Sequence, residues 1–492
     1  MKKNVFSKIV FVVLLVTLFT ASGMTGLQEK SMMHGNVVEA VSQDAPKYVF
    51  YFIGDGMGAS QRQMAEYYLQ ETTNNKDAKL VINNLPVAGI NTTYSEDSLV
   101  TDSAAAGTAL ATGYKTNNGM IAQLPNGKKV KTLVEAAEEK GMATGIVSTT
   151  RLTHATPAVF ASHNASRDNE NEIAEDFVTS GVDFFAGGGA RYFIPKDGLK
   201  DGEALMKSKR VDNRNLIKEF EKSGYKTFLG KTSTDAFRNM TVNGQQKVFA
   251  AFNDSHMPYE VDRVHNNDVP SLAEMTEKGI DVLSEYDKGF FMMVEGGRID
   301  HACHANDAKG AINDTLAFDE AVKKAYTFYK EHPKETLIVV VGDHETGGMG
   351  LGFGKNYFLK MNNLKDVKIS VEDVLQGKYT GDRDTYFKYI AENFGLKNLT
   401  TDEKAKIEKA MDRVDKKEEI DRNEYGGYDP VAIEATHVLS ERTNMQWTTY
   451  AHTATSIPMS AVGVGQENFS GYKDNTEIAQ DMAKLMRFAL TK

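Results

Sequence analysis

The sequence predicts an α/β fold with a mostly parallel central sheet, helices on both faces, and helical or polar insertions. Apolar β-like runs recur along the chain, and each leads into a loop and then a helical pattern. Repeated units of strand, loop and helix are typical of parallel sheets covered on both sides. In addition, three of the runs lead into a carboxylate, directly or after a single glycine, and ligands bind at the carboxyl ends of strands in open α/β sheets.

The expected elements begin after about Ala45. The apolar runs at 48–53, 142–147, 290–294 and 337–341 are expected strands. Residues 132–140 predict a helix that Gly141 closes, and residues 307–331 predict a long helix that stops before Pro333. Each of these two helices leads into the next expected strand.

Two stretches interrupt the alternation, at about 196–264 and 355–436, and both are expected to be insertions on a catalytic domain that spans 45–492. The second contains Thr400 and Glu403 in a capping-box pattern ahead of apolar residues at helical spacing. The mixed charge of 402–422 is most simply the solvated face of that helix.

The amino terminus has the features of a secretory signal peptide. Lys2, Lys3 and Lys8 precede a short apolar run at 9–20, so residues 1–40 are expected to hold a signal peptide and a possible pro-segment. An uncleaved membrane anchor is the alternative. The mature protein is expected to be exported, periplasmic or extracellular, without stable membrane insertion.

Composition excludes some classes of site and partner. The formal charge of −10 argues against a nucleic-acid surface, so an anionic substrate would need local cations or bound metal. The single cysteine, Cys303, excludes an intrachain disulfide and a tetrathiolate zinc site.

Candidate ligands follow the expected strands. Glu295 comes directly after one of them, and Asp55 and Asp343 each follow another after a single glycine, with His344 beside Asp343; His154 and Thr156 follow the fourth. The carboxyl ends of parallel strands meet at one edge of a sheet, so these side chains are expected to converge. Oxygen and imidazole ligands that converge predict a multi-metal site.

A second candidate segment, 100–113, consists almost entirely of small residues around Ser103. A serine at a helix N-terminus, where backbone N–H groups meet an anion, suits a nucleophile that a metal could activate. The alternative is a tightly packed, alanine-rich helix start.

Two further clusters contain histidine. Asp300 and His304 are four residues apart, a spacing that lets both reach one ion on a helix. His301 is a less certain ligand, and Cys303 is more simply a small buried hydrophobe. His452 taken alone could be a satisfied core histidine.

Five of these segments, taken in order, resemble the alkaline phosphatase family of bacteria and animals. They are Asp55 to Gly58, Asp102 to Thr108, Glu295 to His304, Asp343 to Glu345, and Ala451 to Thr453. The resemblance implies hydrolysis of a broad range of small phosphate monoesters through a phosphoserine on Ser103.

The resemblance also implies two zinc ions and one magnesium ion per chain. One zinc would be held by Asp300, His304 and His452, and the other by Asp55, Asp343, His344 and the Ser103 oxygen. Magnesium would take Asp55, Thr156 and Glu295. Arg167 matches the arginine of the family that binds phosphate. Binding two phosphate oxygens at once requires the planar fork of a guanidinium group. A homodimer is expected by family analogy alone.

One departure concerns the third metal site. Enterobacterial members carry Asp where this chain has His154 and Lys where it has His301, whereas animal and many other bacterial members carry His at both. Imidazole favours zinc or cobalt over magnesium, so weak magnesium binding is expected here.

Three alternatives to the monoesterase remain open. A sulfatase of the same superfamily would need a Cys/Ser-x-Pro-x-Arg context, which Ser103 lacks. A phosphodiesterase commonly lacks the arginine clamp and often uses a threonine nucleophile. A non-catalytic secreted metal- or phosphate-binding protein leaves Ser103 unexplained.

Overall fold

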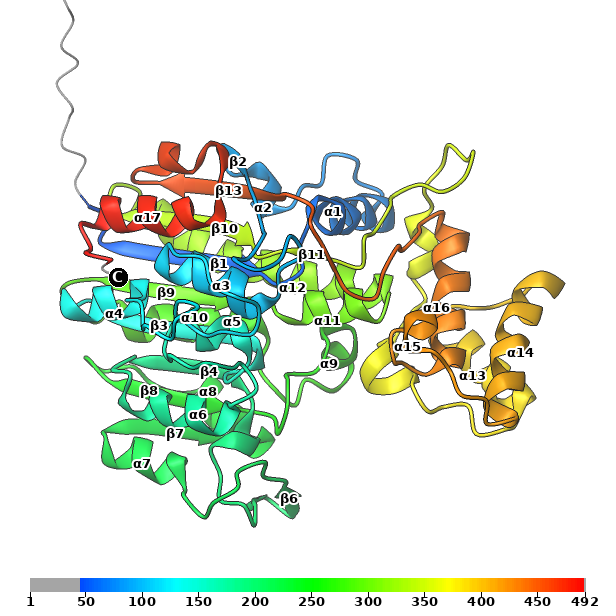
Figure 1. The fold of residues 1–492 in the computed structure, drawn as a ribbon, viewed down its shortest axis with the longest axis horizontal. Coiled ribbons are helices and arrows are strands. Elements are labelled where there is room, and N and C mark those ends of the chain that lie inside the picture. Colours follow the sequence, from blue (N-terminus) through cyan, green and yellow to red (C-terminus); the bar gives the residue numbers. More distant parts are fainter. Residues whose placement is uncertain (1–44, 491–492) are drawn as a thin grey trace, which may run out of the picture. The chain divides into compact units, whose positions relative to one another are not determined.

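The computed structural model describes residues 45–490, which form one compact unit. The expected signal peptide and pro-segment at 1–40 lie outside the described residues. Ten strands form the main sheet in the order β14-β2-β13-β10-β1-β9-β3-β4-β8-β7 (Figure 1). Seven neighbouring strands of this sheet run parallel, and they are β10 (Thr336–Gly342), β1 (Tyr48–Gly54), β9 (Phe290–Glu295), β3 (Ala143–Arg151), β4 (Phe184–Gly188), β8 (Lys247–Ala251) and β7 (Tyr225–Leu229).

The opposite edge of the sheet is mixed. β13 (Ile457–Gly463) pairs antiparallel with β10 and with β2 (Val87–Asn91), and β14 (Gly471–Lys473) is parallel to β2. Two short pairs lie outside the sheet, β11 (Glu345–Thr346) with β12 (His452–Thr453), and β5 (Leu199–Asp201) with β6 (Ala204–Met206).

Both faces of the sheet are covered because its central strands are apolar on both sides. Every residue of β1 is buried; Phe50 and Phe52 belong to one hydrophobic cluster, whereas Val49 and Tyr51 belong to the other. The first cluster takes in helices α1 (Ala59–Thr73), α10 (Leu272–Leu283), α11 (Arg298–His304) and α12 (Ala308–Glu331). The second takes in α3 (Ser103–Thr112), α4 (Leu133–Glu139), α5 (Ala155–Ala158), α6 (Glu170–Thr179), α7 (Leu216–Lys222) and α17 (Asn475–Met486).

This architecture confirms the predicted fold class, and local signals explain where two of the expected helices begin. Thr132 and Glu135 form a capping box at the start of α4. The Asp307 side chain accepts a hydrogen bond from the Gly310 N–H and caps α12.

Residues 196–264, expected to be an insertion, contribute to the main sheet as well as to its surroundings. β7 and β8 extend the sheet at its edge. Lys226 of β7 is exposed and Thr227 half-buried, so the segment lacks the long apolar run that marks the central strands. The remaining parts of this stretch are β5, β6, α7, η2 (Lys231–Ser233), α8 (Thr234–Arg238) and α9 (Glu260–Asn266).

Residues 355–436 contribute helices and no strand of the main sheet (Figure 1). The expected capping box is present, with Thr400 and Glu403 at the start of α14, which buries Ile407, Ala410 and Met411. The helices that begin in this segment are η3 (Met361–Leu364), the π-helix η4 (Val371–Leu375), α13 (Arg383–Asn393), α14 (Thr401–Asp415), α15 (Arg422–Tyr425) and α16 (Pro430–Thr443).

The remaining short elements are α2 (Val81–Asn84), η1 (Ala190–Tyr192) and η5 (Gln466–Phe469). Within residues 45–490, no helix has both the length and the apolar character needed to cross a membrane.

Candidate metal centre

The carboxyl ends of the central strands bring the candidate ligands together. In the sheet register, Gly54 of β1 lies beside Gly342 of β10, and Ile53 lies beside Glu295 of β9. Asp55 and Asp343, the residues after those two glycines, therefore leave the sheet at the same edge as Glu295. Three groups of potential metal ligands result within the described part of the chain.

The first group is Asp300, His304 and His452. Asp300 and His304 lie on α11 at the expected four-residue spacing, and His304 Nε2 is 3.3 Å from an Asp300 carboxylate oxygen. His452 comes from β12, and its Nε2 is 3.1 Å from His304 Nε2. The three ligand atoms converge from segments that are far apart in the sequence.

The second group is Asp55, Asp343 and His344, all fully or almost fully buried. His344 Nε2 lies 3.4 Å from Asp55 Oδ1 and 3.3 Å from Asp343 Oδ2. Ser103 Oγ lies 3.2 Å from the same nitrogen. The candidate nucleophile therefore borders this group directly.

The third group is Asp55, His154 and Glu295. Thr156, expected here as a ligand, donates a hydrogen bond to Asp55 Oδ2 at 3.3 Å. The Glu295 carboxylate accepts hydrogen bonds from Ser148 and, at 3.1 Å, from the Thr150 hydroxyl. His154 thus lies among the possible ligands of this group.

Contacts on the far side of each histidine ring turn Nε2 toward the ligand groups. Nδ1 of His304 is 2.6 Å from the Tyr450 carbonyl oxygen, and Nδ1 of His452 is 2.8 Å from the Thr101 carbonyl oxygen. A carbonyl oxygen only accepts, so each Nδ1 carries a proton, which leaves Nε2 as the nitrogen that can bind a metal. Such contacts orient histidines that bind metal.

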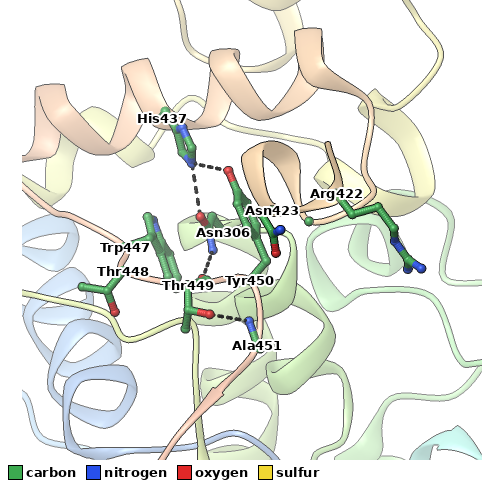
Figure 2. A pocket seen from close by; sticks show the side chains of 10 residues that line it. Asn306, Arg422, Asn423, His437, Trp447, Thr448, Thr449, Tyr450 and Ala451 are labelled. Atoms are coloured by element: carbon green, nitrogen blue, oxygen red, sulfur yellow. Dashed lines mark hydrogen bonds between the residues drawn. The ribbon is translucent and has the colours of Figure 1, made fainter. Parts of the chain in front are cut away.

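The segment that carries Tyr450 is itself held by polar contacts around a pocket of about 350 Å³ (Figure 2). Asn306 donates to the Thr449 carbonyl at 3.1 Å, and its side-chain oxygen lies 3.1 Å from His437 Nε2 (Figure 2). The Tyr450 hydroxyl donates to the Glu424 carbonyl at 3.0 Å. Helices α15 and α16, which carry Glu424 and His437, therefore support the loop that leads to His452.

Buried charge makes the second and third groups suitable for cations. Burial raises the pKa of Asp55 well above its usual range, and the Asp343 carboxylate raises it further. Burial also raises the pKa of Glu295 to about 7. Buried carboxylates this close together must share protons or positive ions, so cation binding would displace protons from them.

Unpartnered polar atoms indicate where cations fit. Asp55 Oδ1, Asp343 Oδ2, Glu295 Oε1 and His154 Nδ1 are all buried and have no hydrogen-bond partner. Buried polar atoms without partners are costly, and these four belong to the two carboxylate-rich groups. Their oxygen and nitrogen donors match what zinc and magnesium accept.

A close packing of backbone brings the groups together. Gly56 has φ of +70°, and a Cβ there would lie 2.8 Å from both the Asp300 Cα and the Thr346 hydroxyl oxygen. Only glycine fits this turn, since it tolerates the left-handed backbone and leaves room for the neighbouring ligand segments.

The helix that begins at Ser103 is organised by Asp102. One Asp102 carboxylate oxygen accepts from the Ala105 N–H at 2.9 Å and caps α3. The other accepts from the Gly119 N–H at 2.9 Å and from Arg167 at 3.1 Å. Ser103 is therefore the first residue of a capped helix, and Arg167 is held beside it.

Arg167 also lies 3.0 Å from His154 Nε2. The expected phosphate clamp and the expected tuning residue of the third site are thus in contact. Sequence reasoning gave no role to Asp102, although it stands directly before the expected nucleophile in the quoted motif.

His301 lies beside the third group without being part of it. Its ring centroid is 5.5 Å from that of His154 and 4.3 Å from that of His256. Arg298 donates to His301 Nδ1 at 3.0 Å. His256 was missed because it is a lone histidine in a polar loop, and only the fold brings it to this cluster.

Cys303 is fully buried, in agreement with its interpretation as a small buried hydrophobe. The Gln61 amide lies 3.7 Å from its sulfur. Burial raises the pKa of this thiol well above its usual range. The residue belongs to the hydrophobic core beside α11.

Comparison with known proteins agrees with this geometry. A family model described as alkaline phosphatase matches residues 46–488. Alkaline phosphatase 3 of Bacillus subtilis is 36% identical over 480 residues, which cover 94% of this chain and 96% of the relative. The alkaline phosphatase of Schizosaccharomyces pombe is 31% identical over 471 residues, which cover 92% and 83%.

Solved structures give the same result. The Thermus thermophilus alkaline phosphatase has a TM-score of 0.77 at 28% identity, over 95% of this chain and 97% of that structure. A His-to-Asp variant of the alkaline phosphatase from the Antarctic bacterium TAB5, with magnesium bound in its M3 site, has a TM-score of 0.61 at 27% identity, over 91% and 99%.

Proposed function

Since the chain belongs to the alkaline phosphatase family, it hydrolyses phosphate monoesters, and we propose that it does so through a phosphoserine on Ser103. One observation carries this proposal. The Ser103 hydroxyl lies 3.2 Å from His344 Nε2, at the border of a buried ligand group with unpartnered carboxylate oxygens. A serine at such a position can be activated without a neighbouring general base.

We assign two zinc ions and one magnesium ion to the three ligand groups. Asp300, His304 and His452 would hold one zinc, and Asp55, Asp343, His344 and the Ser103 oxygen the other. Asp55, Thr156 and Glu295 would hold magnesium. When bound, the zinc ions would lower the pKa of the Ser103 hydroxyl and of a water, and stabilise charge on the entering and leaving oxygens.

The residues of the chain supply position and charge. Ser103 Oγ loses its proton to solvent and attacks phosphorus in line, and the alcohol leaves with the electrons of the P–O bond and takes up a proton from solvent. Water then loses a proton and attacks the phosphoserine from the side that the alcohol left, and the Ser103 oxygen leaves phosphorus and takes up a proton. Arg167 holds two equatorial oxygens in its planar fork, while Asp102 keeps the guanidinium oriented.

His154 tunes the third site in this proposal. One of its ring nitrogens lies within 4.8 Å of carboxylate oxygens of Asp55 and Glu295, and its buried Nδ1 has no hydrogen-bond partner, so this group presents an imidazole nitrogen beside its oxygens. Magnesium prefers oxygen ligands and water, whereas zinc accepts imidazole readily. Magnesium would therefore bind weakly here, and zinc would compete with it.

An assay of substrate class tests the proposal. Metal-stripped protein is given zinc and magnesium, and its turnover of an aryl phosphate, an aryl phosphodiester and an aryl sulfate is compared at alkaline pH. We expect the phosphate monoester to be preferred by orders of magnitude. Preference for the diester or the sulfate would refute the proposal, and so would the absence of turnover in protein with bound zinc.

We also propose that the mature chain is exported to the periplasm or the extracellular space, acts on a broad range of small phosphate monoesters and forms a homodimer. The support is the basic and apolar pattern at 2–20 and the family relationship. Cell fractionation, a substrate panel and light scattering test the three statements separately.

A further inference from the structure

Thr346 contacts ligands of both expected zinc ions although it is assigned to neither. Its hydroxyl lies within hydrogen-bonding distance of Asp300 Oδ1, in the first ligand group. The same oxygen lies 3.2 Å from Nδ1 of His344, in the second group. Thr346 is fully buried, so bulk water does not reach these contacts.

Hydrogen-bond chemistry gives this chain of contacts one direction. An ionised Asp300 only accepts, so the single hydroxyl proton of Thr346 goes to Asp300. The Thr346 oxygen then accepts from His344, which requires the His344 proton on Nδ1. That tautomer leaves the His344 Nε2 lone pair pointing at Asp55, Asp343 and Ser103.

The backbone of Thr346 is fixed independently of its hydroxyl. Its N–H donates to the Gly56 carbonyl at 3.3 Å, and its carbonyl accepts from Gln61 at 2.9 Å. In the β11–β12 pair, Thr346 lies directly opposite His452. The hydroxyl is therefore presented rigidly to Asp300 and His344, and its removal should leave the backbone in place.

We propose that Thr346 is a positioning residue whose hydroxyl links the two zinc sites by fixing the His344 tautomer and orienting Asp300. This inference rests on the metal assignment in the proposed function. It goes beyond that assignment because it makes the two sites dependent on one another through a residue that binds neither ion.

Substitution by valine removes the hydroxyl and keeps the shape. In Thr346→Val, the His344 Nδ1–H and Asp300 Oδ1 both lose their shared partner. Loss of such an outer contact typically weakens metal binding roughly 10–100-fold. We expect that loss for both zinc ions in Thr346→Val, and near wild-type binding in Thr346→Ser, which restores the hydroxyl.

The test is a competition between metal-stripped full-length protein and a chromogenic chelator, with zinc as the probe. Thr276→Val is the matched control, because Thr276 is equally buried and its hydroxyl bonds only the Leu272 carbonyl within α10. Zinc binding by Thr346→Val that equals that of the control would overturn the inference alone. A wild-type chain that binds no zinc would overturn the metal assignment as well.

A second measurement does not depend on the folding of the valine variant. Nitrogen-15 spectra of the metal-stripped wild type with labelled histidines report which nitrogen of each ring carries the proton. The signals of His344 are identified as those that are missing from the spectrum of His344→Gln. We expect His344 to be protonated at Nδ1. A His344 protonated at Nε2 would contradict the proposed direction of the contacts.

Discussion

The two carboxylate oxygens of Asp102 make different contacts, and substitutions can remove one contact without the other. One oxygen caps α3 at the Ala105 N–H, and the other pairs with Arg167. Asp102→Ala removes both contacts. Asp102→Ser keeps a capping hydroxyl but is too short to reach the partners of the second oxygen, so it removes the contacts with Arg167 and with the Gly119 N–H.

The contacts of Asp102 indicate how much stability and phosphate affinity each variant should lose. Loss of an N-cap costs about 1 kcal/mol, which for a unit of this length lowers the melting temperature by about 1 °C. The Asp102 and Arg167 side chains are 21% and 24% exposed, so their ion pair is worth about 0.5–1 kcal/mol. Loss of that orientation should raise the inhibition constant for inorganic phosphate about 2–5-fold.

The assay combines thermal denaturation with inhibition by phosphate during hydrolysis of an aryl phosphate. Both variants lose the Gly119 N–H contact and should lose the same phosphate affinity, whereas Asp102→Ala, which also loses the cap, should melt at a lower temperature than Asp102→Ser. Wild-type phosphate affinity in both variants would refute the argument that Asp102 orients Arg167. Equal melting temperatures for the alanine and serine variants would refute the capping argument.

Four further predictions concern single side chains. Ser103→Ala should fold and bind zinc but lose most turnover, since only residual catalysis of water attack remains; near-normal activity would remove Ser103 from the mechanism. Arg167→Ala should raise KM and weaken phosphate inhibition with a smaller loss in kcat, and unchanged phosphate affinity would mean that another cation forms the clamp. His154→Asp should tighten magnesium binding roughly 10–100-fold and abolish activation by added magnesium, because an oxygen ligand replaces imidazole. The measurement is a magnesium titration of activity at fixed zinc. Equal activation midpoints for the wild type and the variant would contradict a tuning role. The Arg442 hydrogen bonds lower the pKa of Glu403 to about 2, so this pair stabilises the fold above pH 4.5 and its contribution is lost as pH falls toward 2. The melting temperature of Glu403→Gln should therefore fall less than that of the wild type between pH 4.5 and 2. An equal fall in both proteins would show that the pair contributes nothing.

The central strands were predictable because burial on both faces leaves a continuous apolar run. The runs at 48–53, 290–294 and 337–341 correspond closely to β1, β9 and β10. Edge strands lack that signal: β7 mixes buried and accessible residues and includes Lys226, so its stretch resembled an insertion.

The ligand groups were predictable where a motif combined residue type with position at a strand end. Asp55, Glu295 and Asp343 are of this kind, and the structure brings them to one edge of the sheet. Contacts between side chains of separate segments carry no such signal. Thr346 meets Asp300 across 46 residues of sequence, and His256 meets His301 at a similar separation, so only the fold determines these contacts.

The central claim is that phosphate passes through Ser103, and direct trapping of the intermediate tests it. Wild type and Ser103→Ala are mixed with a phosphate monoester, quenched in acid within one turnover, digested and analysed by mass spectrometry. The mechanism predicts one phosphoryl group on Ser103 in the wild type and none in the variant. A phosphoryl group on another residue, or turnover by Ser103→Ala at the wild-type rate, would contradict it.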